Sequence, residues 1–545
     1  MSKTTSRGLA LLAGGLSAVL LAGCAQTTPG ETTGSPGPSA DSITIGTTDK
    51  VTSIDPAGSY DNGSFFVMNQ VYGFLMNTVP GSTDMTPQPD LAESGEFTDP
   101  STYTVKLKPG LKFANGNDLT SSDVKFSFDR QITIADPNGP SSLLGNLDSV
   151  NAPDDTTVEF KLKVPNDQIF PQVLTSPVGP IVDEESFPAD KTLADADIVA
   201  AKPWSGQYGI STYNFNQLIA YEANGDYQGL LGAPKTASVN EKFYADASNM
   251  KLDIEQNNID VAHRSLSATD IESLRGNDKV TVEEGPGGEI RYLVYNFTTM
   301  PFGTGAADAD PAKATAVRQA MASLIDRSAV SEQVYKDTYQ PLFAHIADGF
   351  TGSDEQLKPL YGDGEGGPSV DAAKKALTDA GITDPVALNI QYSPDHYGPS
   401  SGDEYAMYKA QLEEGGLFTV NLQSTEWVQY SKDRSSDVYP LYQLGWFPDF
   451  SDADNYLTPF FTKENFLGNH YDNAEVQALI TAQATEPDAT KREELIKQIQ
   501  DILAVDLPTL PLLQGKQFAF AAQGVTGAGE TLDASFKFRI GVLAK

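Results

Sequence analysis

The sequence predicts an α/β protein, because segments with strand periodicity and segments with helix periodicity alternate along its 545 residues. Residues 103–108 alternate apolar and polar side chains, as a half-buried strand does. Thr120 is expected to cap a helix, since Asp123 follows at the spacing of a capping box. A chain of this length exceeds what one hydrophobic core organises, so we expect about two to four structural units.

The other expected elements follow the same two patterns. Strands are predicted at residues 42–45, 158–164, 387–392 and 418–422, with short closing strands near Phe518 and Phe536. The helix that Thr120 is expected to cap has Val124 and Phe128 on one face. Further helices are predicted at 316–326, at 370–380 between Ser369 and Gly381, and at 491–505 with Leu495, Ile499 and Ile502 on one stripe.

The first residues have the pattern of a secretory signal peptide. Lys3 and Arg7 precede an apolar stretch over residues 9–21, and the only cysteine of the chain, Cys24, follows in a run that resembles a bacterial lipobox. We therefore expect residues 1–23 to be a lipoprotein signal peptide and Cys24 to carry lipid. The alternative is an ordinary secretion signal with a cysteine at its cleavage site. Residues 24–41 are rich in Thr, Gly, Pro and Ser and are expected to form a flexible tether.

Charge and composition argue against several classes of function. The formal net charge of −36 disfavours binding to nucleic acid. No histidine has a second histidine or a cysteine at metal-ligand spacing. We found no nucleophile elbow and no phosphate-binding loop. The expected protein is not an enzyme and has no metal and no cofactor.

Several separated segments resemble one family. They are residues 53–57 (SIDPA), 103–130 (YTVKLKPGLKFANGNDLTSSDVKFSFDR), 317–320 (VRQA) with 325–327 (IDR), and 491–511. They are similar to the extracellular solute-binding proteins of family 5, which are lipoprotein receptors of ABC importers for peptides, nickel and other solutes.

The resemblance implies a type II periplasmic-binding-protein fold of cluster C, with two lobes joined by a hinge and an additional domain in the first lobe. The expected boundaries are 42–75, 191–290 and 505–545 for the first lobe, 76–190 for the additional domain, and 291–504 for the second lobe.

The segment around Asp449 resembles the part of the family that holds the ligand. Residues 444–449 read LGWFPD, and in peptide-binding members the aspartate three positions after the tryptophan pairs with the α-ammonium of the peptide. The resemblance assigns that role to Asp449. A buried ammonium needs such a charge-assisted partner, because an unpaired buried charge is costly. The alternative is that Asp449 caps a turn or is solvated.

Other expected ligand contacts surround this aspartate. Trp446 is interpreted as an apolar wall, or otherwise as a core residue, and Phe447 is placed beside it. Gly445 lacks a Cβ and would allow a ligand backbone to approach. Tyr60 and Asn62, in the polar segment after the first strand, are expected to form the facing wall.

One segment departs from the dipeptide-specific pattern of the family. Those members carry an arginine for the ligand carboxylate in the segment that matches residues 391–399, which here read QYSPDHYGP. The missing arginine favours longer peptides, or a ligand with no carboxylate at that depth. His396 is a possible ligand contact or a solvated loop histidine.

We therefore expect a monomeric, lipid-anchored receptor on the outer side of the cell membrane that captures oligopeptides and delivers them to an ABC permease. The alternatives are a family-5 receptor for a nickel complex, haem or an oligosaccharide, a receptor for signalling, and a cell-surface peptide hydrolase.

Overall fold

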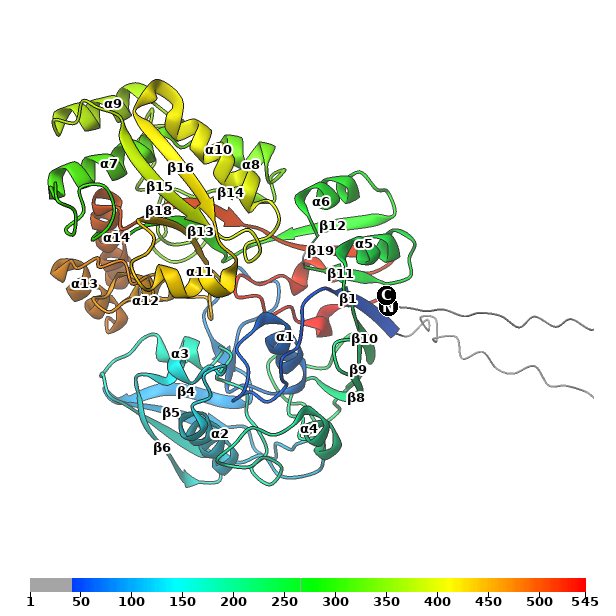
Figure 1. Ribbon diagram of the computed structural model, residues 1–545. Helices are drawn as coiled ribbons and strands as arrows, with labels where there is room; N and C mark the ends of the chain where they lie inside the picture. Colours follow the sequence, from blue (N-terminus) through cyan, green and yellow to red (C-terminus); the bar gives the residue numbers. More distant parts are fainter. Residues whose placement is uncertain (1–41, 265) are drawn as a thin grey trace, which may run out of the picture. The chain divides into compact units, whose positions relative to one another are not determined.

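The computed structural model describes residues 42–264 and 266–545. The expected signal peptide, the lipidated Cys24 and the tether lie outside the described residues. The fold is α/β, as predicted, with three larger sheets and helices between their strands (Figure 1).

The first lobe is built on a seven-stranded mixed sheet. Its first strand, β1, lies between β10 and β11 and runs parallel to both. Ile43 and Ile45 of β1 are fully buried in the core that also contains residues of helix α1. In spatial order the strands are β12 (Val280–Gly285), β19 (Gln517–Ala522), β11 (Val261–His263), β1 (Ser42–Thr47), β10 (Ser238–Phe243), β9 (Leu218–Ala223) and β8 (Tyr208–Asn214).

The second lobe is built on a six-stranded sheet. Strand β13 is antiparallel to both its neighbours, β17 and β18, while β15 is parallel to β16 and β17. Helix α10 packs against β15 and β16, and α7 packs against α9 and α10 (Figure 1). In spatial order the strands are β14 (Tyr339–Pro341), β18 (Thr509–Gly515), β13 (Ile290–Tyr295), β17 (Leu441–Trp446), β15 (Val386–Tyr392) and β16 (Phe418–Ser424).

A four-stranded antiparallel sheet lies within the range expected for the additional domain. Helix α2 packs against two of its strands, β6 and β7, and Val124 and Phe128 of α2 are buried in the core beneath the helix. The strands are β4 (Ala92–Asp99), β5 (Thr102–Leu107), β7 (Thr157–Leu162) and β6 (Leu147–Asp154), and a short ribbon of β2 (Met76–Asn77) and β3 (Gln88–Pro89) precedes them.

The helices begin mostly at side-chain caps. Thr120 and Asp123 form the predicted capping box, and Ser369 caps α9 as predicted. The α-helices are α1 (Asn62–Val71), α2 (Ser121–Ile134), α3 (Phe170–Val173), α4 (Asp195–Ala201), α5 (Ala247–Glu255), α6 (Ala268–Arg275), α7 (Pro311–Leu324), α8 (Arg327–Gln333), α9 (Val370–Asp379), α10 (Ser401–Glu413), α11 (Trp427–Arg434), α12 (Thr458–Phe461), α13 (Ala474–Ala484) and α14 (Ala489–Asp506).

Two local predictions near the C-terminus are wrong. The buried stripe of α14 runs through Ile496, Ile499 and Leu503, whereas the predicted members Leu495 and Ile502 are only partly buried. No strand forms at Phe536, whose φ of 63° lies in the left-handed region and cannot continue an extended strand.

The chain passes between the lobes at positions that differ from the expected ones. It enters the six-stranded sheet at Ile290, one residue before the expected start of the second lobe. Strand β18 lies in the range expected for the first lobe, but it pairs with β13 and β14 of the second. The return to the first lobe therefore comes at β19, with only Lys516 between the two strands.

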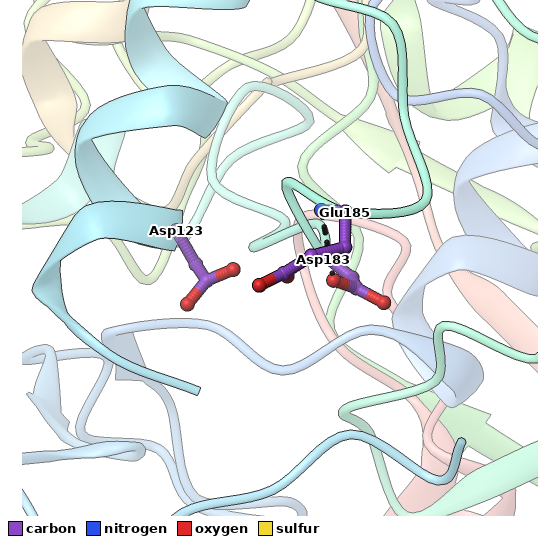
Figure 2. A group of neighbouring side chains, drawn as sticks. All are labelled: Asp123, Asp183 and Glu185. Carbon is purple, nitrogen blue, oxygen red and sulfur yellow. Dashed lines mark hydrogen bonds between the residues drawn. The ribbon is translucent and has the colours of Figure 1, made fainter. Parts of the chain in front are cut away.

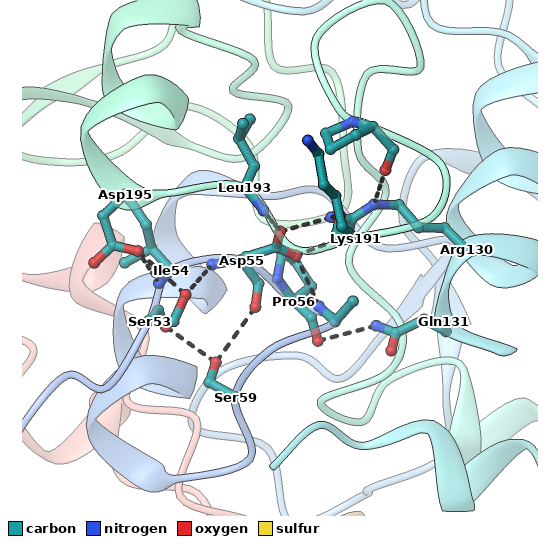
Figure 3. A network of polar contacts seen from close by, with 12 residues as sticks. Ser53, Ile54, Asp55, Pro56, Ser59, Arg130, Gln131, Lys191, Leu193 and Asp195 are labelled. Atoms are coloured by element: carbon teal, nitrogen blue, oxygen red, sulfur yellow. Dashed lines mark hydrogen bonds and ion pairs between the residues drawn. The ribbon is translucent and has the colours of Figure 1, made fainter. Parts of the chain in front are cut away.

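A buried ion pair joins two of the segments that carry the family resemblance (Figure 3). Arg130, at the end of one, donates to both carboxylate oxygens of Asp55 in the other, at 2.7 and 2.6 Å. Both side chains are almost fully buried. Arg130 also donates to the carbonyl oxygens of Pro188 and Lys191, and Asp55 accepts from the backbone of Leu193. The two segments thus fasten α2 to the loop that follows β1.

None of the helices in residues 42–264 and 266–545 is long and apolar enough to cross a membrane.

Candidate functional site

Asp449 is held at the end of strand β17 by its neighbour Asn455. The side-chain oxygen of Asn455 accepts from the backbone N–H of Asp449 at 3.0 Å and from Nε1 of Trp446 at 2.8 Å. Its Nδ2 donates to the Asp449 carboxylate at 3.3 Å. From the first lobe, the hydroxyl of Tyr60 donates to the other carboxylate oxygen. The carboxylate therefore lies between the lobes with two neutral donors.

The protonation of Asp449 reflects this environment. Desolvation by burial raises the pKa of Asp449 to about 6, although the hydrogen bonds from Tyr60 and Asn455 act in the opposite direction. No lysine, arginine or histidine among the described residues forms an ion pair with it. At neutral pH this site is a partly buried negative charge, and no cationic side chain of residues 42–264 and 266–545 is paired with it.

Two of the predicted residues before Asp449, Trp446 and Gly445, contact other parts of the protein. Trp446 is partly buried, with its ring packed edge-to-face on Phe460 at 5.0 Å, and its indole N–H fixes Asn455. A Cβ on Gly445 would approach the carbonyl oxygen of Ile290 to 2.8 Å and the ring of Tyr397 to 3.1 Å. The expected open space beside Gly445 is therefore filled by the protein, and the backbone approach that needs glycine is internal.

Tyr60 and Asn62 flank the start of helix α1. Between them, Asp61 caps the helix by accepting from the backbone N–H of Ser64 at 2.8 Å. The ring of Tyr60 is 40% exposed, and Asn62 is partly buried as the first residue of the helix. The structure brings Tyr60 to Asp449, and shows no contact between Asn62 and Asp449.

A cavity of about 450 Å³ opens next to this site. Its wall comes from both lobes, with α6 and β19 on one side and β13, β14 and the loop after β15 on the other. Phe447 lines it, facing Phe536 of the first lobe at a ring distance of 5.2 Å. Asp449 itself does not line the cavity, but it is only two residues from Phe447. A volume of this size is typical of small-ligand sites, at roughly 300–1,000 Å³.

An ion pair in this wall was not predicted. Nε of Arg291 donates to Glu289 at 2.5 Å, and Nη2 donates to the hydroxyl of Tyr339 at 2.8 Å. Nη1 donates to the carbonyl oxygen of Tyr397 at 3.1 Å. Residues 391–399 contain no arginine, yet the fold brings one to this loop from β13. Glu289 and Arg291 are the charged residues of the otherwise apolar stretch 289–295, which marks them as a pair but does not indicate the contact with Tyr397.

His396 lies in the same loop and lines the cavity. Its ring stacks on Trp427 at 3.6 Å. Desolvation and the positive charge of Arg291 lower the pKa of His396 to about 4, so it is neutral at pH 7. It is a wall residue and adds no charge to the cavity.

Three carboxylates gather elsewhere, at the start of α2 (Figure 2). Asp183 accepts from the side chains of Asn115 and Asn117 at 2.7 and 3.0 Å. Asp123 accepts from the backbone N–H groups of Thr120 and Glu184 at 2.8 and 3.1 Å. Glu185 completes the group. These oxygens stabilise the helix start and the turn at 183–186, and we assign the cluster a structural role.

The two-lobed α/β fold, with a cavity between the lobes, has the architecture of the type II periplasmic-binding proteins. The model of the family described as "Bacterial extracellular solute-binding proteins, family 5 Middle" matches residues 86–468. The chain belongs to this family.

Individual relatives match nearly the whole chain. The probable D,D-dipeptide-binding periplasmic protein DdpA of Escherichia coli is 25% identical over 489 residues, which cover 87% of this chain and 88% of the relative. The heme-binding protein A of Haemophilus influenzae is 26% identical and covers 84% of each chain. The structure of HbpA2 from Haemophilus parasuis superposes with a TM-score of 0.77 at 22% identity, covering 92% of this chain and 99% of that one.

Proposed function

We propose that this protein captures oligopeptides outside the cell membrane and delivers them to an ABC permease, with Asp449 holding the peptide α-ammonium. The observation that carries this proposal is the carboxylate of Asp449, which lies between the lobes with Tyr60 and Asn455 as neutral partners and without a cationic partner in the described part of the chain. A protonated peptide amine would supply the positive partner that this carboxylate lacks among the described residues.

A contact at the peptide terminus suits a receptor for mixed cargo. An ammonium bound to a carboxylate in a partly desolvated site forms a charge-assisted hydrogen bond, which is stronger than a neutral one. Every peptide with a free N-terminus carries this group, so the contact does not depend on the amino-acid sequence of the cargo. The dipeptide-binding relative supports the same cargo class.

Ligand capture in this proposal is a two-state hinge motion. Asp449 and Tyr60 belong to different lobes and meet only when these lie together. A peptide shifts the receptor toward the closed form to the extent that it binds that form more tightly.

Mass spectrometry of ligand that co-purifies with the protein tests the cargo class. A mixture of peptides of several sequences supports the proposal. One defined nickel chelate, haem or glycan contradicts it. Haem is the alternative ligand that most needs testing, because a relative of similar sequence identity is a heme-binding protein. A surface hydrolase would return cleaved peptides, whereas a receptor returns them intact.

Isothermal titration with a peptide and the Asp449→Ala variant tests the site. We expect a loss of tens-fold or more in affinity, because leaving a buried charge without its partner costs about 2–5 kcal/mol. Asp379→Ala is the matched control, since its side chain is 64% exposed on α9. Wild-type affinity in Asp449→Ala would refute the assignment.

We further propose that lipid on Cys24 holds the receptor at the membrane. Incorporation of labelled fatty acid into the wild-type protein in cells, and its absence in Cys24→Ala, is the expected result. A labelled Cys24→Ala protein would show that the lipid is elsewhere.

A further inference from the structure

The cavity beside Phe447 is lined by several charged side chains, and each of them already has a partner of opposite charge. The pairs are Arg291 with Glu289 at 2.5 Å, Asp270 with Lys251 at 3.1 Å, Arg264 with Asp49 at 3.3 Å and Lys516 with Glu284 at 3.4 Å. The two histidines of the wall add no charge, because desolvation lowers the pKa of His263 well below neutrality and that of His396 to about 4. Glu284 also accepts from Arg275 at 2.6 Å, so the edge of the wall at Lys516 carries a net positive charge, whereas the buried Arg291–Glu289 pair is neutral as a pair.

Arg291 and Glu289 form the most buried of these pairs, and both side chains can make further hydrogen bonds. The side chains of Arg291 and Glu289 are 5% and 10% exposed. A guanidinium has five N–H groups, and three of those of Arg291 bond to Glu289, Tyr397 and Tyr339. A carboxylate has about four acceptor positions, and Glu289 is approached by Arg291 and by the Tyr339 hydroxyl, at 2.9 Å to each oxygen. Donors and acceptors therefore stand side by side at zero net charge.

Aromatic rings make up much of the remaining wall. Phe447 and Phe536 lie on one side, under the guanidinium of Arg264 at 5.8 and 5.1 Å from their centroids. The rings of Tyr339 and Tyr397 lie at 5.0 and 4.8 Å from the guanidinium carbon of Arg291. Flat apolar walls around one polar pair suit a planar group that is itself polar.

We propose that this cavity is a side-chain pocket of the receptor that selects a carboxamide, as in Gln or Asn, over charged and purely apolar side chains. A carboxamide carries N–H donors and a carbonyl acceptor in one plane, which complement Glu289 and Arg291 respectively. The inference rests on the proposed capture of peptides and adds the side chain that the pocket takes.

The neutrality of the Arg291–Glu289 pair explains why the pocket rejects ions at this pair. A ligand carboxylate could bond to Arg291 only in competition with Glu289, and a ligand ammonium could bond to Glu289 only in competition with Arg291. Either ion would lose its water without gaining an unpaired counter-charge. An apolar side chain would displace water from Arg291 and Glu289 without replacing its hydrogen bonds, which is unfavourable.

Isothermal titration of the wild-type protein with a peptide panel tests this selectivity. Tetra-alanine is the parent, and Gln, Glu, Lys or Leu replaces the alanine at the second, third or fourth position in turn. At one of these positions we expect the Gln peptide to bind at least about tenfold more tightly than the other three, in line with sites that hydrogen-bond their substrate. Equal affinity for all four at every position, or a preference for Glu, Lys or Leu, would overturn the inference.

Two variants test the role of the ion pair directly. Glu289→Gln leaves the positive charge of Arg291 and should move the preference to the Glu peptide. Tyr339→Phe keeps both charges and the ring, removes one hydroxyl, and should reduce the Gln preference without creating one for an ion. An unchanged preference in a folded Glu289→Gln protein contradicts the inference. Should that variant not fold, the wild-type panel and Tyr339→Phe decide.

The outcome separates this inference from the proposed function. Binding of the parent peptide that depends on Asp449, without selectivity in the panel, would overturn the carboxamide pocket alone. Failure of every peptide to bind would overturn both.

Discussion

The hydroxyl of Tyr60 donates a hydrogen bond to the carboxylate of Asp449, although the two residues are 389 positions apart in the chain. Tyr60 precedes α1 in the first lobe, and Asp449 follows β17 in the second. This bond therefore joins the two lobes at the place where we put the peptide amine. A neutral donor stabilises the carboxylate only in part, and burial still raises the pKa of Asp449 to about 6.

Removal of the Tyr60 hydroxyl should favour opening of the ligand-free receptor. Hydrogen bonds to charged groups contribute about 1.5–3 kcal/mol, so Tyr60→Phe should raise the open fraction severalfold or more. Small-angle X-ray scattering should give a larger radius of gyration for ligand-free Tyr60→Phe than for wild type, and equal values with saturating peptide. Equal radii without peptide would show that this bond does not influence closure.

Neutralising Asp449 should stabilise the ligand-free protein above pH 6. The folded-state pKa of about 6 exceeds the ordinary value of 3.8, so the cost of the buried charge is absent below pH 3.8 and complete above pH 6. At about 1.36 kcal/mol per pKa unit, Asp449→Asn should gain up to about 3 kcal/mol at pH 8. Thermal melting at pH 8 and pH 4 measures this difference, with Asp379→Asn as the exposed control. A lower melting temperature at pH 8 would contradict the prediction.

Peptide affinity should depend on pH with a maximum between about 6 and 8. Below about pH 6 Asp449 gains a proton and loses the charge that attracts the ammonium. Above about pH 8 the α-amine of the peptide loses its proton, since its ordinary pKa is about 7.7–8.0. Titrations from pH 5 to 9 measure the profile. The acid limb should disappear in Asp449→Asn, and its persistence there would assign it to another group.

Breaking the pair of Arg130 and Asp55 should destabilise the first lobe. Arg130→Met leaves the Asp55 carboxylate buried with only N–H donors, and such a change costs about 3–5 kcal/mol. Lys125→Met in the same helix is the control, because the Lys125–Asp129 pair is 44% and 43% exposed and surface pairs contribute about 0–1 kcal/mol. Denaturant unfolding measures both, and similar losses in the two variants would refute a special role for the buried pair.

Local rules predicted the parts of the fold that depend on neighbouring residues. The capping box at Thr120 was predicted because both partners lie within four residues. The predicted strand near Phe536 does not form, because the backbone of this residue is left-handed and cannot continue an extended strand. A phenylalanine in the sequence does not indicate that conformation. The sequence-based boundaries also placed β18 in the first lobe. The strand joins the second lobe because it pairs with β13, which is more than 200 residues away in the chain.

The same distinction applies to the candidate site. The segment containing Asp449 was found because its residues are contiguous and resemble a family motif. The contact of Arg291 with the backbone of Tyr397 spans 106 residues and leaves no local pattern. Residues 391–399 contain no arginine, but the fold brings Arg291 from β13 to this loop. Periodicity and motif spacing do not contain that information.

The most direct test of the Asp449 assignment compares one peptide with a free N-terminus and the same peptide with an acetylated N-terminus, by titration into the wild-type protein at pH 7. Acetylation removes the positive charge and leaves the rest of the peptide intact. The account predicts that the acetylated peptide binds at least tens-fold more weakly and that Asp449→Asn removes this difference. Equal affinities of the two peptides for the wild-type protein would contradict it.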